Sequence, residues 1–174
     1  MAKSNYFNSR LITQTPDDLD TDVPWVIGNH APYTERDILF TVNTSNGGER
    51  NRTWFIHFTN FAFDHTVPDT ITGVEVVLKT RRNGRVYDET VCLSYAIEPI
   101  SDNKTSYITD GYDHYPVNDT TKYGGEGDLW GGPTLSKNRV LDEHFGVTLR
   151  FQGHPYTPHK CGMGVESVQI CFYS

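Results

Sequence analysis

Apolar residues alternate with other residues in several stretches of this chain, and this periodicity constrains the fold more than any other feature of the sequence. The alternation is cleanest near the C-terminus, at Phe145, Val147, Leu149 and Phe151, and at Val168, Ile170 and Phe172. Successive side chains of a β-strand point to opposite faces, so a period of two predicts strands that bury one face. We therefore expect β-strands packed around a core.

Further strands are predicted at 38–42, 53–59, 71–80 and 86–97, with a short one near 107–108. The chain has 10 Tyr, 9 Phe, 3 Trp and 15 Gly residues, a composition that favours strands and turns over helices. One short helix is expected within 134–143, capped by Thr134 or Ser136. A chain of 174 residues is long enough for one core, so the predicted fold is an all-β antiparallel sandwich or jelly roll.

An Asn-Gly pair lies between two of the predicted strands, in the sequence Arg82-Asn83-Gly84-Arg85. This dipeptide accepts positive φ at both central positions of a type I′ turn. The sequence therefore predicts that the strands at 71–80 and 86–97 form a hairpin.

The first 36 residues show no sustained period, and we interpret them as an N-terminal arm or irregular cover on a sandwich formed by 37–174. The segment holds an acidic run at 17–22, and Trp25 is its expected anchor on the core. It also holds apolar residues that a solvated tail does not need, and these are the candidate partner contacts: Tyr6, Phe7, Leu11 and Ile12. We expect the arm to dock on neighbouring subunits while the sandwich folds without it.

Charge and hydropathy exclude several classes of partner. The net charge of −7 opposes binding to nucleic acid or to an anionic membrane. No stretch is apolar enough to span a bilayer, and the first residues lack the apolar core of a secretory signal. The odd number of cysteines, Cys92, Cys161 and Cys171, favours free thiols in a reducing compartment over a disulfide framework.

No pattern in the sequence favours catalysis, and we expect no enzyme activity, cofactor or metal. The nucleophile elbow, the phosphate loop and the dinucleotide fingerprint are absent, and no spacing singles out a pair of catalytic carboxylates. Two weak metal patterns stay open beside a solvated-loop interpretation: a zinc set at His154, His159 and Cys161 with His114, and a calcium loop at Asp18, Asp20 and Asp22. Tyr112 and Tyr115 could stack on sugars, although packing under a long loop is the favoured interpretation.

A series of short motifs runs through the chain from about Trp25 to the end. It comprises Phe58-Thr59-Asn60-Phe61-Ala62-Phe63, Val67-Pro68-Asp69-Thr70-Ile71-Thr72-Gly73-Val74, Tyr123-Gly124-Gly125-Glu126-Gly127-Asp128-Leu129-Trp130-Gly131, Phe145-Gly146-Val147 and the closing Val168-Gln169-Ile170-Cys171-Phe172-Tyr173. This series resembles a β-sandwich module of virion proteins in tailed bacteriophages. Ala62 and Val67 depart from the usual glycine and isoleucine, and both changes concern packing.

The resemblance implies a structural protein of the virion, made in the host cytoplasm, that decorates or cements the particle against the major capsid protein or against neck or tail proteins. A homo-oligomer, with a trimer favoured, is the expected assembly. The alternative is a receptor- or glycan-binding module of a tail, neck or head fibre. The short chain shows no shaft repeat, which argues against a whole tail fibre. Because fold does not fix function, both expectations rest on analogy.

The motif residues also have a direct physical interpretation that involves no chemistry. Phe61 and Phe63 are expected to anchor the core, Gly73 to permit close sheet packing, and Gly146 to mark a bulge or a close backbone approach. The glycines around 128–130 suit a tight loop that folds Trp130 onto the sandwich, with Asp128 bonding loop amides.

Overall fold

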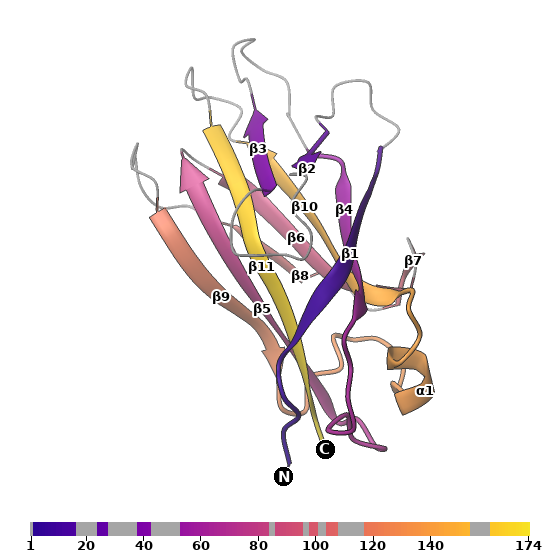
Figure 1. Cartoon of the computed structure of the whole chain (residues 1–174). Helices are drawn as coiled ribbons and strands as arrows, with labels where there is room; N and C mark the ends of the chain where they lie inside the picture. Colours follow the sequence, from indigo (N-terminus) through magenta and orange to yellow (C-terminus); the bar gives the residue numbers. More distant parts are fainter. Residues whose placement is uncertain are drawn as a thin grey trace.

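The computed structural model describes residues 2–16, 24–27, 38–42, 53–83, 86–95, 98–100, 104–107, 117–153 and 161–174. These residues form an antiparallel all-β structure with one short helix, which confirms the predicted fold class (Figure 1). The elements are β1 (Phe7–Thr15), β2 (Val26–Ile27), β3 (Ile38–Val42), β4 (Phe55–Phe61), β5 (Gly73–Asn83), β6 (Val86–Tyr95), β7 (Glu98–Pro99), β8 (Lys104–Tyr107), β9 (Val117–Gly125), α1 (Lys137–Val140), β10 (Phe145–Gly153) and β11 (Cys161–Tyr173). The described residues include no helix that is long and apolar enough to cross a membrane.

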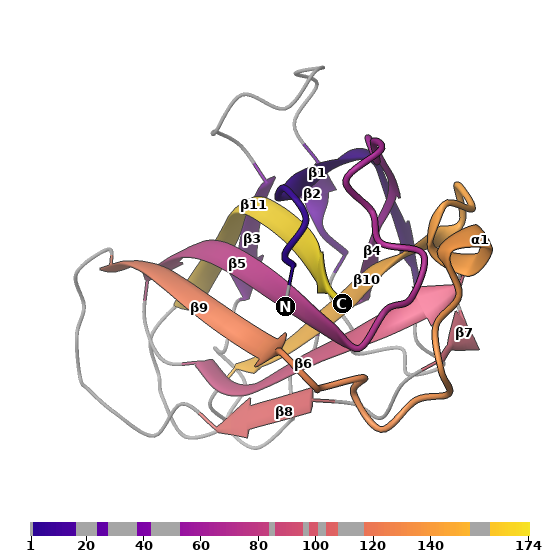
Figure 2. The same cartoon turned by 90° about the horizontal axis from the view of Figure 1, so that it is seen from below.

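The strands form two layers that β1 joins into one strongly curled sheet, as the view in Figure 2 shows. In the first layer, sheet A, β11 pairs with β3 and β5, β3 also pairs with β2, and β5 also pairs with β9. In the second layer, sheet B, β10 pairs with β4 and β6, and β6 also pairs with β7 and β8. The first two residues of β1, Phe7 and Asn8, pair with β11, and the strand pairs with β4 from Ser9 onward.

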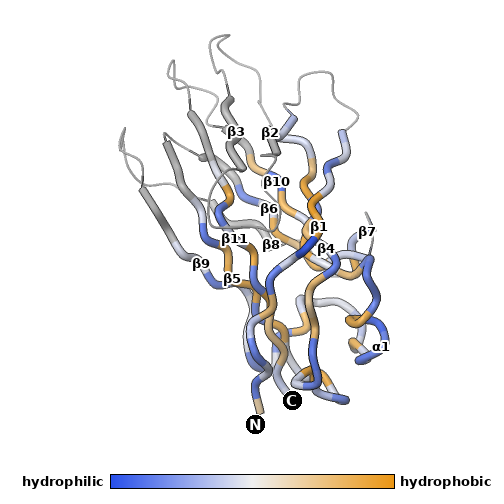
Figure 3. The backbone as a smooth tube through the Cα atoms, viewed as in Figure 1, coloured by the Kyte–Doolittle hydropathy of each residue, from blue (hydrophilic) through white to orange (hydrophobic). Residues whose placement is uncertain are grey.

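The core lies between the inner faces of the two sheets, where the period of two places the apolar residues. Val74, Val76 and Leu78 of β5 face it from sheet A, and Val147 and Leu149 of β10 face it from sheet B; all five are 0 % exposed. Hydrophobic colouring recurs along the strands of both sheets in Figure 3. Large aromatic side chains fill the rest of the interior: Trp130, Phe145, Phe151 and Phe172.

The expected irregular arm over 1–36 is wrong for residues 7–15, because they form strand β1 of the sandwich itself. Phe7 and Asn8 pair with Ile170 and Gln169 of β11, and from Ser9 onward β1 pairs with β4. The residues before β1 are also tied down, since Ser4 N–H donates to the Phe172 carbonyl at 2.9 Å and Phe172 N–H donates to Ser4 Oγ at 2.9 Å. Residues 7–15 are therefore a strand of the sandwich and not a separate arm or irregular cover.

The predicted hairpin at Asn83-Gly84 is also wrong. Within the described residues, β5 pairs with β9 and β11 in sheet A, whereas β6 pairs with β10, β7 and β8 in sheet B. The chain therefore passes from one sheet to the other between Asn83 and Val86. An isolated two-stranded ribbon is only marginally stable, whereas β5 and β6 each pair with other strands on both sides in their own sheets.

The glycine-rich loop after β9 folds as its sequence predicts. Trp130 is 0 % exposed, and its indole Nε1–H donates to the Val74 carbonyl at 3.0 Å. Trp130 N–H donates to Asp128 Oδ1 at 2.7 Å, which is the expected loop bond. A Cβ on Gly73 would overlap the Gly125 carbonyl, and one on Gly146 would overlap the Phe58 carbonyl, so close approach explains both glycines.

The remaining motif residues support the core. Trp25 is 3 % exposed, donates from Nε1 to the Trp54 carbonyl at 2.8 Å and meets Phe151 edge-on. Phe61 is buried, and the half-buried Phe63 stacks on it with a centroid distance of 5.7 Å. The other motif positions pack around the loop or have left-handed backbone: Tyr123 is buried beside Trp130, Pro68 is half-buried, and Gly124, Gly125 and Gly131 have positive φ. Ser136 caps α1 as predicted, accepting from Arg139 N–H.

Candidate binding groove

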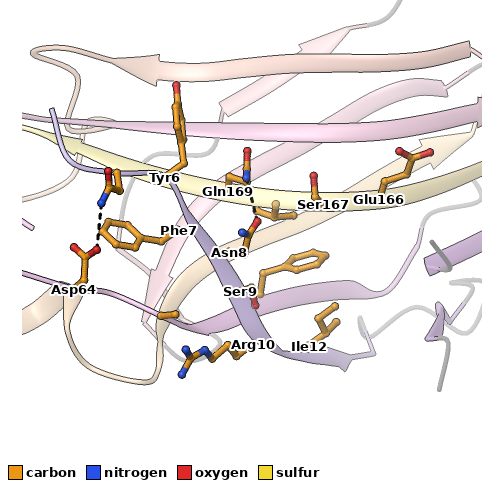
Figure 4. A pocket seen from close by; sticks show the side chains of 14 residues that line it. Tyr6, Phe7, Asn8, Ser9, Arg10, Ile12, Asp64, Glu166, Ser167 and Gln169 are labelled. Atoms are coloured by element: carbon orange, nitrogen blue, oxygen red, sulfur yellow. Dashed lines mark hydrogen bonds between the residues drawn. The ribbon is translucent and has the colours of Figure 1, made fainter. Parts of the chain in front are cut away.

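A groove opens where β1 leaves β11 and crosses to β4. Its volume is about 890 Å³, and it lies between the divergent strands β1 and β11 (Figure 4). The divergence has a simple origin, because β1 pairs with β11 only through Phe7 and Asn8 before it joins sheet B. The groove is thus a product of the strand that joins the two sheets.

Apolar side chains from both sheets line one part of the groove. Phe7 and Ile12 come from β1, Phe58 from β4 and Val168 from β11. Phe7, Phe58 and Val168 are at most 3 % exposed, so they belong mainly to the core beneath.

Polar side chains line the rest, and amides, carboxylates and a guanidinium are all represented. The side chains are those of Asn5, Asn8, Arg10, Asp64, Glu166 and Gln169. Two of their mutual contacts appear as dashed lines in Figure 4: Gln169 Nε2 donates to Asn8 Oδ1 at 3.1 Å, and Asn5 Nδ2 donates to Asp64 Oδ2 at 3.2 Å. The hydroxyl and amide N–H of Thr66 donate to Asp64 and lower the pKa of that carboxyl. Asp64 is therefore ionised at neutral pH.

Along the outer face of sheet A, several groove residues point to the same side. Figure 4 shows Tyr6, Gln169, Ser167 and Glu166 in this orientation. Glu166 is paired with Lys79, whose Nζ lies 3.0 Å from Glu166 Oε2. The tyrosine at one end of this row is 37 % exposed.

Tyr6 also belongs to a polar cluster beside the groove, which we call the Glu75 cluster: Lys3, Tyr6, Glu75, Lys122 and Tyr173. The Tyr6 hydroxyl donates to Glu75 Oε1. Lys3 Nζ lies 3.2 Å from the same oxygen, and Lys122 Nζ lies 3.4 Å from it. Tyr173 donates to the other oxygen, Oε2, at 3.2 Å. Every partner of Glu75 is thus a donor, which favours the charged carboxylate.

Burial of Glu75 disfavours its charged form, but its donors outweigh that effect. The hydrogen bonds from Tyr6 and Lys3, with the charges of Lys3 and Lys122, lower the pKa of Glu75 to about 2. The pKa of Lys3 is raised, mainly by its hydrogen bonds to Tyr6 and Tyr173. Glu75, Lys3 and Lys122 are therefore charged at neutral pH.

A second polar group lies within sheet B, and His57, Thr148 and Ser94 in it are buried. His57 Nε2 lies 2.9 Å from Thr15 Oγ1, His57 Nδ1 lies 2.8 Å from Thr148 Oγ1, and Thr148 Oγ1 lies 2.7 Å from Ser94 Oγ. His57 is only 2 % exposed, and its burial lowers its pKa. Each ring nitrogen has a hydroxyl partner, so this chain of bonds satisfies buried polar groups and is not open to a substrate.

The four candidate partner-contact residues separate into two kinds. Phe7 is 3 % exposed in the core and is therefore not free to dock on a partner, whereas Ile12 is half-buried and packs against the core. Tyr6 at 37 % and Leu11 at 46 % are exposed. Sequence reasoning missed the polar lining and the Glu75 cluster, since these residues meet only through the pairing of β1, β5, β9 and β11.

Several expectations fall outside the described residues. They concern the histidines at 114, 154 and 159, the aspartates at 18, 20 and 22, and the tyrosines at 112 and 115. The side chain of Cys161 is likewise not described, whereas Cys92 and Cys171 are free and buried. The described part of the chain contains no group of three or more His, Cys, Asp or Glu residues placed to hold a metal ion.

Comparison with known proteins does not assign the chain to a family. No protein-family model matches the chain, and no curated protein matches it. Among solved structures, it is similar to botulinum neurotoxin type C, which depends on interaction with two ganglioside molecules for entering cells. The identity is 11 % and the TM-score 0.42, with 97 % of this chain and 47 % of that structure covered, so the chain spans about half of it. Similarity at this level carries no functional argument.

Proposed function

We propose that this protein is a non-enzymatic recognition domain on the outside of a tailed-phage particle, and that it binds a glycan on the host surface. The phage setting follows from the motif resemblance, and the glycan from the groove. The observation that carries the proposal is the open groove of about 890 Å³ between β1 and β11, with its lining of amides, carboxylates, a guanidinium and an exposed tyrosine.

The chemistry of this lining suits a sugar. A sugar hydroxyl both donates and accepts hydrogen bonds. An amide side chain such as that of Asn8 or Gln169 offers an acceptor oxygen and a donor NH₂ group, so it can bond to the hydroxyl in either way. The exposed ring of Tyr6 offers an apolar face with a polar tip, to which the C–H face of a sugar ring can pack. A few convergent polar groups around apolar surface are what small-ligand sites generally present.

The direct test is an array of bacterial surface oligosaccharides probed with the purified chain. We expect Asn8→Ala to weaken binding of a retained oligosaccharide roughly two- to tenfold, the effect of one lost hydrogen bond. Asn138→Ala removes the same side chain from exposed α1 and is the matched control. Absence of binding to every oligosaccharide, or equal loss in both variants, would contradict the proposal.

A second candidate is the decoration or cement protein, for which the exposed apolar residues of the N-terminal region provide an observation. Leu11 lies on β1 with 46 % of its surface exposed, so it is accessible to a neighbouring subunit. If this candidate is right, the chain binds stoichiometrically to particles that lack it, and Leu11→Ser weakens that binding without lowering the melting temperature. Light scattering of the purified chain would test the trimer.

A further inference from the structure

The Glu75 cluster places two lysines on one carboxylate beside the groove. Lys3 and Lys122 both lie against Glu75 Oε1, at 3.2 and 3.4 Å. Both ammonium groups also lie near the Tyr6 hydroxyl, at 2.8 and 3.4 Å. Tyr6 is part of the groove lining, so both ammonium groups lie next to a residue that lines the groove.

The charges of this cluster do not cancel. One carboxylate compensates one ammonium, so one positive charge remains in a protein whose net charge is −7. Both tyrosines act as uncharged donors, since their hydroxyls donate to Glu75. The carboxylate of Glu166 farther along the groove has its own lysine, Lys79.

The remaining charge is accessible at Lys122. Its side chain is 57 % exposed, against 36 % for Lys3 and 10 % for Glu75. An ammonium has three N–H donors, and Lys122 directs donors to two acceptors, Tyr6 and Glu75, so a further donor can serve an acceptor from solvent or ligand. The buried carboxylate thus holds an exposed cation in place.

Anchoring the chain terminus does not require Lys122. Lys3 already lies over the rings of Tyr6 and Tyr173, at 4.6 and 5.0 Å from their centroids. Ser4 is bonded to Phe172 twice, since its N–H donates to the Phe172 carbonyl and its Oγ accepts from the Phe172 N–H. Lys3 and these bonds explain how residues 3 and 4 are held against the sandwich. They do not explain why a second lysine, Lys122, also lies against Glu75 Oε1.

We propose that the Glu75 cluster is the anion subsite of the groove and takes the carboxylate or phosphate group of an acidic glycan. The inference rests on the proposed function and names the class of ligand. A sugar ring would pack along Tyr6 and the amides of the groove, and its anionic group would replace water at Lys122. Carboxylate and phosphate present the same chemistry to an ammonium, and the experiment below separates them.

Two pairs of immobilised sugars that differ in charge provide the test. Trigalacturonate is compared with its neutral methyl ester, and mannose 6-phosphate with mannose. We expect the wild-type protein to retain one acidic form roughly two- to fivefold more strongly than its neutral partner, as one exposed ion pair supports. The preference should weaken as salt is added, because exposed charges are screened. The pair that shows the preference identifies the anionic group.

Lys122→Gln removes the charge and leaves Glu75 with Lys3, Tyr6 and Tyr173 as donors, so the fold should hold. We expect this variant to lose the preference for the acidic form while still binding the neutral one. Lys137→Gln removes a lysine paired with Asp69 outside the groove, and should keep the preference.

Equal binding of the charged and neutral sugars would overturn the anion subsite and leave the proposed function standing. A preference that survives in Lys122→Gln, with thermal unfolding showing that variant to be folded, would also overturn it. Failure to bind any of the four sugars, after an array in which no other glycan binds, would overturn both proposals.

Discussion

At the scale of single residues, side chains that the sequence marks as unusual have identifiable partners. Trp130 has a positive φ of 63°, and its indole is fully buried on the Val74 carbonyl. A non-glycine residue keeps such a backbone conformation only where surrounding contacts hold it. The flanking glycines predicted this loop, because their conformational freedom and the aspartate two residues before the tryptophan are both local signals.

Replacing Trp130 with alanine should lower the free energy of unfolding by roughly 3–5 kcal/mol, since a large buried aromatic leaves a cavity that its neighbours fill only in part. Urea denaturation followed by circular dichroism measures the change. Leu141→Ala is the control, because Leu141 is 44 % exposed and its truncation should cost far less. A Trp130→Ala protein as stable as the control would show that the loop does not hold the core.

Glu75 makes a second prediction at this scale, on pH. Its pKa falls from 4.5 to about 2 in the fold, so the unfolded chain binds the proton more readily. The stability that it contributes is therefore fully present above about pH 4.5 and is lost as the pH falls towards about 2. Exposure of the two lysines screens part of this contribution.

We expect Glu75→Gln to destabilise the protein at neutral pH and to match the wild type more closely at about pH 3, where the wild type has begun to lose this contribution. Unfolding by urea at both pH values gives the comparison. A stability difference that stays constant, or grows, as the pH falls would contradict the charged cluster.

At the scale of elements, β1 shows why part of the fold was not predicted from the sequence. Phe7 and Ile12 both face the core, although they are an odd number of residues apart and a regular strand would point them to opposite faces. The phase changes because the strand leaves sheet A for sheet B after Asn8. A period-two search scores such a strand as irregular, whereas β10 and β11 keep one phase over their clearest stretches and were predicted.

The hairpin predicted from the Asn-Gly pair is wrong for a related reason. The dipeptide reports what a local turn can accept, and it carries no information on which strands lie beside the flanking segments. Pairing of β5 with β9 and β11 over most of its length decided the topology instead. Long-range pairing likewise assembles the groove, which is why its polar residues had no signal in the sequence.

Deleting residues 2–15 should abolish folding, because it removes the strand that joins the sheets and takes Phe7 from the core. Loss of the cooperative unfolding transition and of near-ultraviolet circular dichroism is the expected result. Leu11→Ser keeps the strand and changes an exposed residue, so it should unfold like the wild type. A truncated protein that folds cooperatively would contradict this prediction and support the independent arm that the sequence predicted.

At the scale of the whole molecule, the sandwich carries an open, mixed polar and apolar groove where β1 passes from one sheet to the other. His57 of sheet B is buried, and the described residues hold no metal cluster. The groove and the Glu75 cluster beside it present hydrogen-bonding side chains, an exposed tyrosine and an exposed lysine, and the proposed recognition of a glycan rests on these groups.

The most direct test of this account is to map glycan binding by amide chemical shifts. The ¹⁵N-labelled protein is titrated with the oligosaccharide that the array retains most strongly. We predict that the amides of Tyr6, Asn8, Ser167 and Gln169 shift in a saturable manner, while those of α1 do not. Saturable shifts confined to residues outside the groove, or none at all, would contradict the claim that the groove between β1 and β11 is the binding site.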